Sequence, residues 1–409
     1  MKIKHFPIAS ALLVAPAVFA QPTTINPFPP TGGQSQWHTF HGDSQRTGYS
    51  PYVGPVQPQL KWMLDVGGPV VSSPVIGQNG MIVLGPVLQD GLKPSYDILG
   101  ISPTGSVAWR VKTPFVDGEF QQIATPAIGP MGTVYVGTPE GAFYAIQPDG
   151  KISWKYSAEN PVLQHAVVSP KGRIFVGIDG FLTAFSPGGQ VLWRRSLGTP
   201  RLGGGPSLGR DGTVYAIYGE EGIGSKLKAF SQAGVELWSR DIDLYFWPLA
   251  PPTIGPDGTI YTAAQSIFAF NPDGSQKWIS QPTFGMQNIG SIAVDRSNNL
   301  YYSAYVYLWK LNPSGTVVWQ KTLTGDGFSL GGSYSSILVD RNGNLFTGLG
   351  TGKRWAIPYE KQFLVLNNAG AQIGSFPLPE ISGMSAPALA SDGTLYFGAL
   401  DSKLYAIQP

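Results

Sequence analysis

Residues 143–154 read FYAIQPDGKISW, and residues 182–193 read LTAFSPGGQVLW. In both stretches an apolar run leads into a tight-turn signal, Pro-Asp-Gly or Pro-Gly-Gly, and a second run ends in tryptophan four residues after the last glycine. Turn residues of this kind between alternating apolar runs are the strongest short-range signal for a β-hairpin. Each stretch therefore predicts two antiparallel strands, the second of which carries a tryptophan.

The same pattern recurs along the chain. Seven of the 11 tryptophans are regularly spaced, 39–47 residues apart: Trp62, Trp109, Trp154, Trp193, Trp238, Trp278 and Trp319. A second turn position occurs eight times: Gly80, Gly132, Gly172, Gly212, Gly258, Asn298, Gly343 and Gly393. This turn joins a short run of small and apolar residues to a run rich in β-branched and aromatic residues, so each unit has four strands. A 40–50-residue period of four strands is typical of a β-propeller blade. The fold class predicted is all-β, an eight-bladed β-propeller of four-stranded antiparallel blades.

The ends of the repeat predict how the ring closes. The eighth unit stops after its third strand, at residues 404–409, and Trp62 lies ahead of the first unit. We expect the N-terminal strand around Trp62 to complete the last blade. The seven periodic tryptophans are predicted to be structural wedges between blades, because outer strands lie far apart and need bulky side chains. The seventh unit has Gly374 in place of a wedge; we expect Phe376 to compensate and this blade to be the loosest.

The start of the chain predicts export. Residues 1–20 have a basic start, a short apolar stretch and a small-residue cleavage pattern, which together indicate a signal peptide. Residues 21–36 have the composition of a Pro/Gly-rich linker, and residues 37–409 form the predicted propeller. We therefore expect a periplasmic or extracellular protein.

Composition excludes several classes of function. The chain of 409 residues is 42% hydrophobic and 13% charged, with 53 Gly, 36 Pro and no Cys. This hydrophobic content excludes disorder, and the lack of cysteine excludes disulfides, Cys-ligated zinc, a thiol nucleophile and a lipidated cysteine. Loss of residues 1–20 would remove two lysines and no acid, leaving 25 basic and 25 acidic residues. We expect a monomer with no nucleic-acid partner and no membrane span.

The units at 143–154 and 182–193 resemble the PQQ-like repeat family. The segment ahead of the first unit, WHTFHGDSQRTGYS (37–50), is similar to the W-x-x-F-x-x-D-x-x-x-T-G stretch that precedes such propellers. The resemblance covers residues 37–409 and implies an eight-bladed propeller. The family includes quinoprotein dehydrogenases and cofactor-free scaffolds, among them the propeller lipoprotein of outer-membrane β-barrel assembly. The vicinal cysteines of the former and the lipidated cysteine of the latter are absent here.

The sequence shows no catalytic constellation. Besides His5, the histidines are His38, His41 and His165, and there is no HExxH, no His pair at metal spacing, no acidic calcium loop and no GxSxG. We predict no catalytic residue, no metal site and no cofactor. PQQ with Ca²⁺ is the alternative that the family resemblance leaves open.

The long connections between strands are expected on one face, opposite the short turns. Variable loops on a rigid scaffold commonly carry binding residues. The candidate ligand- or partner-binding residues on this face are Glu119, His165, Arg201, Trp247, Tyr334, Lys353, Arg354 and Trp355.

These observations favour a non-catalytic scaffold that binds a protein partner through its long-loop face, for example in cell-envelope assembly. Two alternatives stay open. One is a PQQ-dependent dehydrogenase; the other is a carbohydrate-binding or carbohydrate-active propeller that stacks a glycan on Trp247 and Trp355.

Overall fold

The strands were assigned in a computed structural model that describes residues 36–89, 95–117, 124–197, 204–220, 224–242, 250–263, 266–281, 291–304, 307–322, 336–348, 361–379 and 385–409. All of them belong to one compact unit, Gly33–Pro409. The predicted signal peptide and nearly all of the predicted linker lie outside the described residues. Those residues form strands and turns, with no helix among them.

Eight four-stranded antiparallel sheets make up the unit. The strands of blades 1 to 4 are β2 (Val75–Ile76), β3 (Ile82–Gln89), β4 (Ser95–Ile101), β5 (Val107–Pro114); β6 (Ala127–Ile128), β7 (Val134–Thr138), β8 (Ala142–Ile146), β9 (Ile152–Ser157); β10 (Val167–Val168), β11 (Ile174–Ile178), β12 (Phe181–Phe185), β13 (Val191–Ser196); and β14 (Ser207–Leu208), β15 (Val214–Glu220), β16 (Gly224–Phe230), β17 (Glu236–Ile242). The strands of blades 5 to 8 are β18 (Thr253–Ile254), β19 (Ile260–Ala263), β20 (Ile267–Phe270), β21 (Gln276–Ser280); β22 (Ala293–Val294), β23 (Leu300–Ala304), β24 (Tyr307–Leu311), β25 (Val317–Thr322); β26 (Leu338–Val339), β27 (Leu345–Gly348), β28 (Gln362–Leu366), β29 (Gln372–Pro377); and β30 (Ala388–Leu389), β31 (Leu395–Gly398), β32 (Lys403–Gln408), β1 (Gln59–Asp65).

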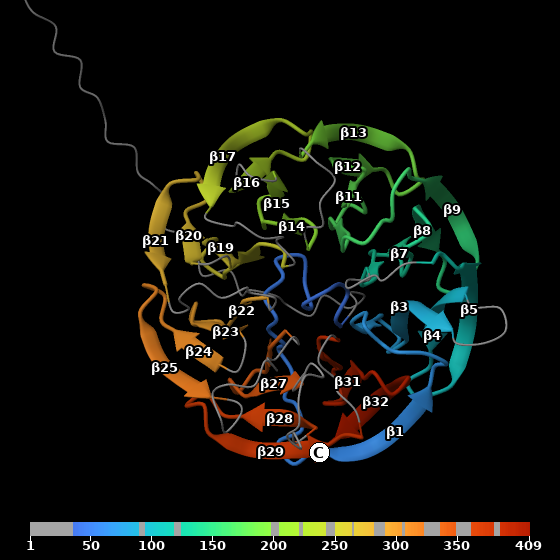
Figure 1. The fold of residues 1–409 in the computed structure, drawn as a ribbon, viewed down its shortest axis with the longest axis vertical. Helices are drawn as coiled ribbons and strands as arrows, with labels where there is room; N and C mark the ends of the chain where they lie inside the picture. Colours follow the sequence, from blue (N-terminus) through green and yellow to red (C-terminus); the bar gives the residue numbers. More distant parts are fainter. Residues whose placement is uncertain are drawn as a thin grey trace, which may run out of the picture. The chain divides into compact units, whose positions relative to one another are not determined.

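The blades follow one another in chain order around a ring (Figure 1). The two-residue strands lie next to the axis, and β1, β5, β9, β13, β17, β21, β25 and β29 form the outer rim. In blade 8, β1 pairs antiparallel with β32, so that Trp62 lies opposite Ala406. The prediction of an eight-bladed propeller closed by an N-terminal strand is confirmed.

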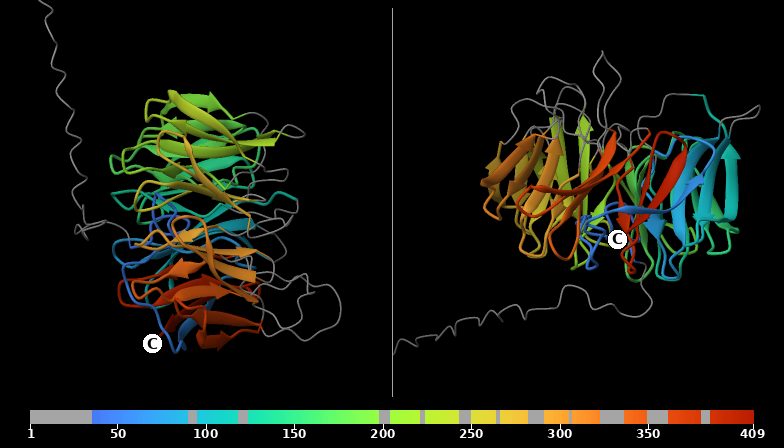
Figure 2. Two further views of the ribbon diagram at one scale, coloured as in Figure 1. Left: turned by 90° about the vertical axis from the view of Figure 1, so that its left-hand side faces the viewer. Right: turned by 90° about the horizontal axis from the view of Figure 1, so that it is seen from below.

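Short turns on one face are built around residues with left-handed backbone. Two kinds of turn lie on this face: one joins the first and second strands of a blade, and the other joins the third and fourth. They share a face because consecutive strands alternate in direction (Figure 2). All eight predicted turn positions have positive φ, including Asn298 at 59°. Asparagine tolerates this region better than most residues, which explains the one substitution for glycine.

A row of four paired residues crosses each blade. In blade 2 the row is Ala127, Tyr135, Ala145 and Trp154, read from the axis to the rim. The small third residue leaves room for the tryptophan, whose ring centroid lies 5.9 Å from that of Tyr135. The row therefore links the inner and outer strands of a blade through aromatic packing.

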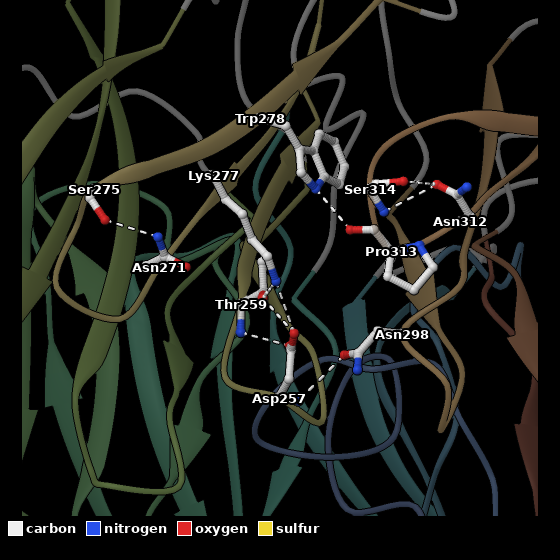
Figure 3. A network of polar contacts seen from close by, with 10 residues as sticks. All are labelled: Asp257, Thr259, Asn271, Ser275, Lys277, Trp278, Asn298, Asn312, Pro313 and Ser314. Atoms are coloured by element: carbon white, nitrogen blue, oxygen red, sulfur yellow. Dashed lines mark hydrogen bonds and ion pairs between the residues drawn. The ribbon is translucent and has the colours of Figure 1, made fainter. Parts of the chain in front are cut away.

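Each tryptophan of the outer strands also contacts the next blade. Figure 3 shows Trp278 of blade 5, whose indole N–H donates to the carbonyl oxygen of Pro313 in blade 6 at 2.9 Å. A β-carbon at Gly315, two residues later, would lie 2.6 Å from the Trp278 ring, so only glycine fits there. Six of the seven periodic tryptophans donate to a backbone carbonyl of the following blade in this way: Trp62, Trp154, Trp193, Trp238, Trp278 and Trp319.

Trp154→Ala is expected to lower the free energy of unfolding by roughly 2–3 kcal/mol, less than the ~3–5 kcal/mol typical of a fully buried Trp, because the side chain is only partly buried. Urea denaturation followed by circular dichroism would measure the loss. Leu192→Ala, at an exposed position of the neighbouring outer strand, is the control and should change stability by less than about 0.5 kcal/mol. Equal losses in the two variants would contradict the packing role of the indole.

Blade 7 lacks a tryptophan for a structural reason. The next blade in the ring is blade 8, whose third strand, β32, and fourth strand, β1, come from opposite ends of the chain. These two strands are not joined by a turn, so an indole from blade 7 would have no turn to pack against. Residues 56–58 take that place: a β-carbon at Gly374 would overlap the carbonyl oxygen of Val56, and Gln57 Nε2 donates to the Ile373 carbonyl at 2.8 Å. Phe376 packs edge-on against Tyr405, with ring centroids 6.2 Å apart, but it shares this role with the N-terminal chain. The looseness expected of blade 7 stays a prediction.

Candidate functional site

A segment ahead of β1 lines the axis of the ring. Residues 36–52, called the hub segment below, hydrogen-bond to the inner strand of one blade after another. The contacts, in blade order, are Trp37 N to Ile76 O, Ile128 N to His38 O, Ser44 Oγ to Val168 O, Leu208 N to Ser44 O, Ile254 N to Gln45 O, Val294 N to Thr47 O, Val339 N to Gly48 O, and Ser391 N, beside the inner strand of blade 8, to Gln36 Oε1. The inner strands are sheet edges whose axial N–H and C=O groups have no partner within their own blade. The hub segment supplies those partners, which buried backbone groups require.

The residues of the W-x-x-F-x-x-D-x-x-x-T-G stretch give the hub segment its shape. Asp43 accepts hydrogen bonds from Thr47 N at 3.0 Å and from Thr47 Oγ1 at 2.6 Å. Gly48 has a φ of +63°, and a β-carbon there would clash with the ring of His41. Phe40 stacks on His165, with ring centroids 4.3 Å apart. The stretch is therefore accounted for by packing and turn formation at the axis.

Arg46 is the buried cation of the hub. Its exposed fraction is 0%, and its guanidinium donates to Thr39 Oγ1 and to the carbonyl oxygens of Phe40, Ala166 and Pro206. Burial lowers the pKa of Arg46 to about 9, with the charge of Asp43 acting in the opposite direction. At neutral pH the guanidinium is still protonated, and it ties the hub segment to the inner strands of blades 3 and 4.

Burial lowers the pKa values of the three histidines at the axis, His38, His41 and His165. His165 is 4% exposed and its Nδ1 accepts from Thr125 N at 2.9 Å; burial, together with the charge of Arg46, holds its pKa well below the usual value. His41 lies between the carbonyl oxygens of Arg46 and Ile337, at 2.9 and 3.0 Å from its two ring nitrogens. Burial outweighs these carbonyls and lowers the pKa of His41 to about 4. The pKa of His38 is also lowered to about 4, first by burial and then by Arg46.

Of the candidate binding residues, only His165 lies within the described part of the chain. Its side chain is buried against the hub segment and does not lie on an exposed surface. The other seven fall outside the described residues: Glu119, Arg201, Trp247, Tyr334, Lys353, Arg354 and Trp355. The strands that flank these seven end on the face opposite the short turns. Their role in binding stays a prediction.

Sequence reasoning missed Arg46. The available signal was a lone arginine between the Asp43 and Thr47 turn residues, in a chain with few charges. Its partners, however, are mostly backbone carbonyl oxygens of blades that are distant in the sequence, and a pattern of side chains cannot predict such contacts.

On the long-loop face, the described strand ends carry internally paired charges. Asp97, fully buried at the end of the β3–β4 hairpin, forms an ion pair with Arg110 and accepts from Ser95 Oγ at 3.0 Å. In blade 2, Glu140 accepts from the hydroxyl of Tyr144 at 2.5 Å and lies 3.6 Å from Lys155. These contacts fix the bases of the loops and neutralise the acids, so they favour a rigid platform over a reactive site.

The described residues do not fit a quinone with its calcium ion. They contain no group of three or more His, Cys, Asp or Glu side chains that could hold a metal ion. Along the axis, the donors of Arg46, both ring nitrogens of His41 and Nδ1 of His165 are directed to protein atoms. The expectation that the whole chain binds no cofactor stays a prediction.

Comparisons with known proteins agree with this architecture. The sequence profile described as outer membrane protein assembly factor BamB matches residues 95–186 and 178–409. BamB from Moraxella catarrhalis is 14% identical, with a TM-score of 0.65 over 86% of this chain and 100% of that chain. Quinohemoprotein alcohol dehydrogenase from Comamonas testosteroni is 13% identical, with a TM-score of 0.67 over 91% and 80%.

A third solved structure, virginiamycin B lyase from Staphylococcus aureus, is 14% identical, with a TM-score of 0.50 over 70% of this chain and 94% of that chain. No curated protein matches the sequence. At such identities the solved structures share the fold alone, while the profile match confirms the resemblance to PQQ-like repeats.

Proposed function

The chain belongs to the family described as outer membrane protein assembly factor BamB, and from that premise we propose that it is an exported, non-catalytic scaffold. It binds a protein partner in cell-envelope assembly through its long-loop face. The described residues include no helix with the length and hydrophobicity to cross a membrane. The periplasm is the proposed location, supported by the family and by the signal-peptide pattern of residues 1–20.

The hub carries this proposal. Among the described residues at the axis, Arg46 and the buried histidines bind the ring itself: Arg46 donates to backbone carbonyls of blades 3 and 4, and His165 accepts from the backbone of blade 2. A propeller whose axis is lined by its own chain has its outer surfaces available for binding. The long-loop face is the more variable of the two faces, which favours it as the binding surface.

The partner-binding test uses Trp247 and Trp355, two tryptophans outside the wedge pattern that the sequence predicts in the long loops. Aromatic anchors dominate protein interfaces, so Trp247→Ala with Trp355→Ala should weaken recovery of the partner at least tenfold. The measurement is crosslinking in intact cells, affinity capture of the chain and quantification of the captured proteins against an uncrosslinked sample. We expect components of outer-membrane protein assembly among the captured proteins.

The matched control for this pair is Lys151→Ala with Lys171→Ala, two exposed positions on the short turns of blades 2 and 3. This variant should capture the partner as the wild type does. The proposal fails if both double variants capture equally, or if the protein binds PQQ with Ca²⁺ tightly and reduces a dye with alcohols or sugars. Binding to a glycan array that disappears in Trp247→Ala would instead support the carbohydrate alternative.

A further inference from the structure

The repeated row of residues is broken in blade 1. Its second position is aromatic in the other seven blades: Tyr135, Phe175, Tyr215, Tyr261, Tyr301, Phe346 and Tyr396. Blade 1 has Val83 there, and Gly100 follows at the third position, where five blades have alanine. Blade 1 thus lacks one aromatic ring and one methyl group that its neighbours have.

The position of the missing ring can be read from the other blades. A β-carbon at Gly129 of blade 2 would lie 3.0 Å from Cε2 of Tyr135, and one at Gly209 of blade 4 would lie 3.3 Å from Cε2 of Tyr215. At Gly77, the corresponding residue of blade 1, none of the three nearest atoms belongs to an aromatic ring. The missing ring therefore leaves space between the turn of blade 1 and blade 2.

A pocket lies at this place. It has a volume of about 220 Å³, and its lining is mostly apolar, with Met81, Val83, Trp109 and Ile128 beside the two polar side chains of Gln78 and Asn79. A cavity of about 150 Å³ with apolar walls is large enough to bind benzene, whereas water needs two or more polar partners. The size and lining of the pocket favour one small aromatic ring.

Trp109 lines the pocket, and its indole N–H is unpaired. The other six periodic tryptophans donate their indole N–H to the next blade, but Nε1 of Trp109 is buried and has no partner. A β-carbon at Gly100 would overlap the Trp109 indole around Nε1, so this orientation of the ring depends on the glycine. An unpaired buried N–H is costly, and an incoming acceptor would remove that cost.

We propose that this pocket is a binding site for a small aromatic molecule of phenol size that carries a hydrogen-bond acceptor. The ring occupies the space that tyrosine or phenylalanine fills in the other blades, and its oxygen accepts the N–H of Trp109. The site lies at the short-turn face between blades 1 and 2, away from the long-loop face, so it goes beyond the proposed scaffold function.

The test uses p-cresol, which is the side chain of tyrosine, and toluene, which has the same ring without the hydroxyl. Isothermal titration and ligand-observed NMR on the full chain should show saturable binding of p-cresol. Toluene should bind about fivefold more weakly, the effect of one neutral hydrogen bond. In Trp109→Phe this preference for p-cresol should disappear.

The Val83→Tyr, Gly100→Ala variant restores the row found in the other blades and fills the pocket. It should weaken p-cresol binding at least tenfold, while its circular dichroism spectrum stays that of the wild type. If it does not fold, Val83→Phe alone provides the same test with a smaller change. Absence of saturable binding in the wild type, or binding retained in a folded filled-pocket variant, overturns the proposal; an unchanged preference for p-cresol in Trp109→Phe overturns the assigned donor.

Discussion

Arg46→Ala is expected to cost about 3–5 kcal/mol of unfolding free energy, the largest loss expected from any single substitution proposed for this propeller. The side chain is fully buried, and its removal leaves the hydroxyl of Thr39 and several backbone carbonyls without their donor. Chemical denaturation at pH 7 measures the loss. Because these acceptors belong to the hub segment and to blades 3 and 4, protection of their inner strands against hydrogen exchange should fall as well.

Two further variants separate the causes of that loss. Arg46→Met keeps most of the volume but none of the donors, so it should be nearly as unstable as Arg46→Ala if hydrogen bonding dominates. Arg341→Ala removes an exposed arginine from a turn of blade 7 and should change stability by less than about 0.5 kcal/mol. If Arg46→Met were as stable as the wild type, the hydrogen bonds of Arg46 would not contribute to stability, and the loss in Arg46→Ala would come from packing alone.

The fold was predictable from the sequence because its signals are local and repeated. The turns need left-handed residues at eight corresponding positions, and six of the seven periodic tryptophans follow a second set of glycines by four residues. Such features depend only on residues within about ten positions of one another. Ring closure was also visible, because an unfinished last unit and a spare Trp62 strand complete each other.

The hub could not be predicted in the same way. Its contacts join residues 36–52 to inner strands up to the far end of the chain, mostly through backbone atoms. The stretch that resembles the family pattern marked where the segment lies, but not that it follows the axis from blade to blade. Gly374 shows the same limit: it could be recognised as a missing wedge, whereas the covering chain at Val56 comes from more than 300 residues away.

Most of the candidate binding residues are harder still to place. They were selected because they depart from the repeat, and a departure has no repeated neighbour from which to infer its position. The pocket of blade 1 illustrates what a departure can mean when its surroundings are described: Val83 and Gly100 read as ordinary small residues until they are compared with the tyrosine and alanine of blade 2.

Acidification should destabilise the propeller well above the pH at which carboxylates titrate. Burial holds the pKa values of His38, His41 and His165 below the ordinary 6.5. A depressed folded-state pKa contributes stability above the unfolded pKa, and that stability is lost as the pH falls from about 6.5 towards the folded value. With these three histidines protonating on unfolding, the free energy of unfolding should drop by roughly 4–6 kcal/mol between pH 7 and pH 5.

Urea denaturation at pH 7, 6 and 5 measures this dependence, and His165→Asn assigns it. The asparagine side-chain oxygen can still accept from Thr125 N, so this variant should fold, with lower stability at pH 7 and about two thirds of the wild-type change towards pH 5. His38 is less buried than the other two, and His38→Gln should reduce the dependence by a smaller amount. Equal stability at pH 7 and pH 5, or an undiminished pH dependence in His165→Asn, would show that the hub histidines are not neutral in the folded protein.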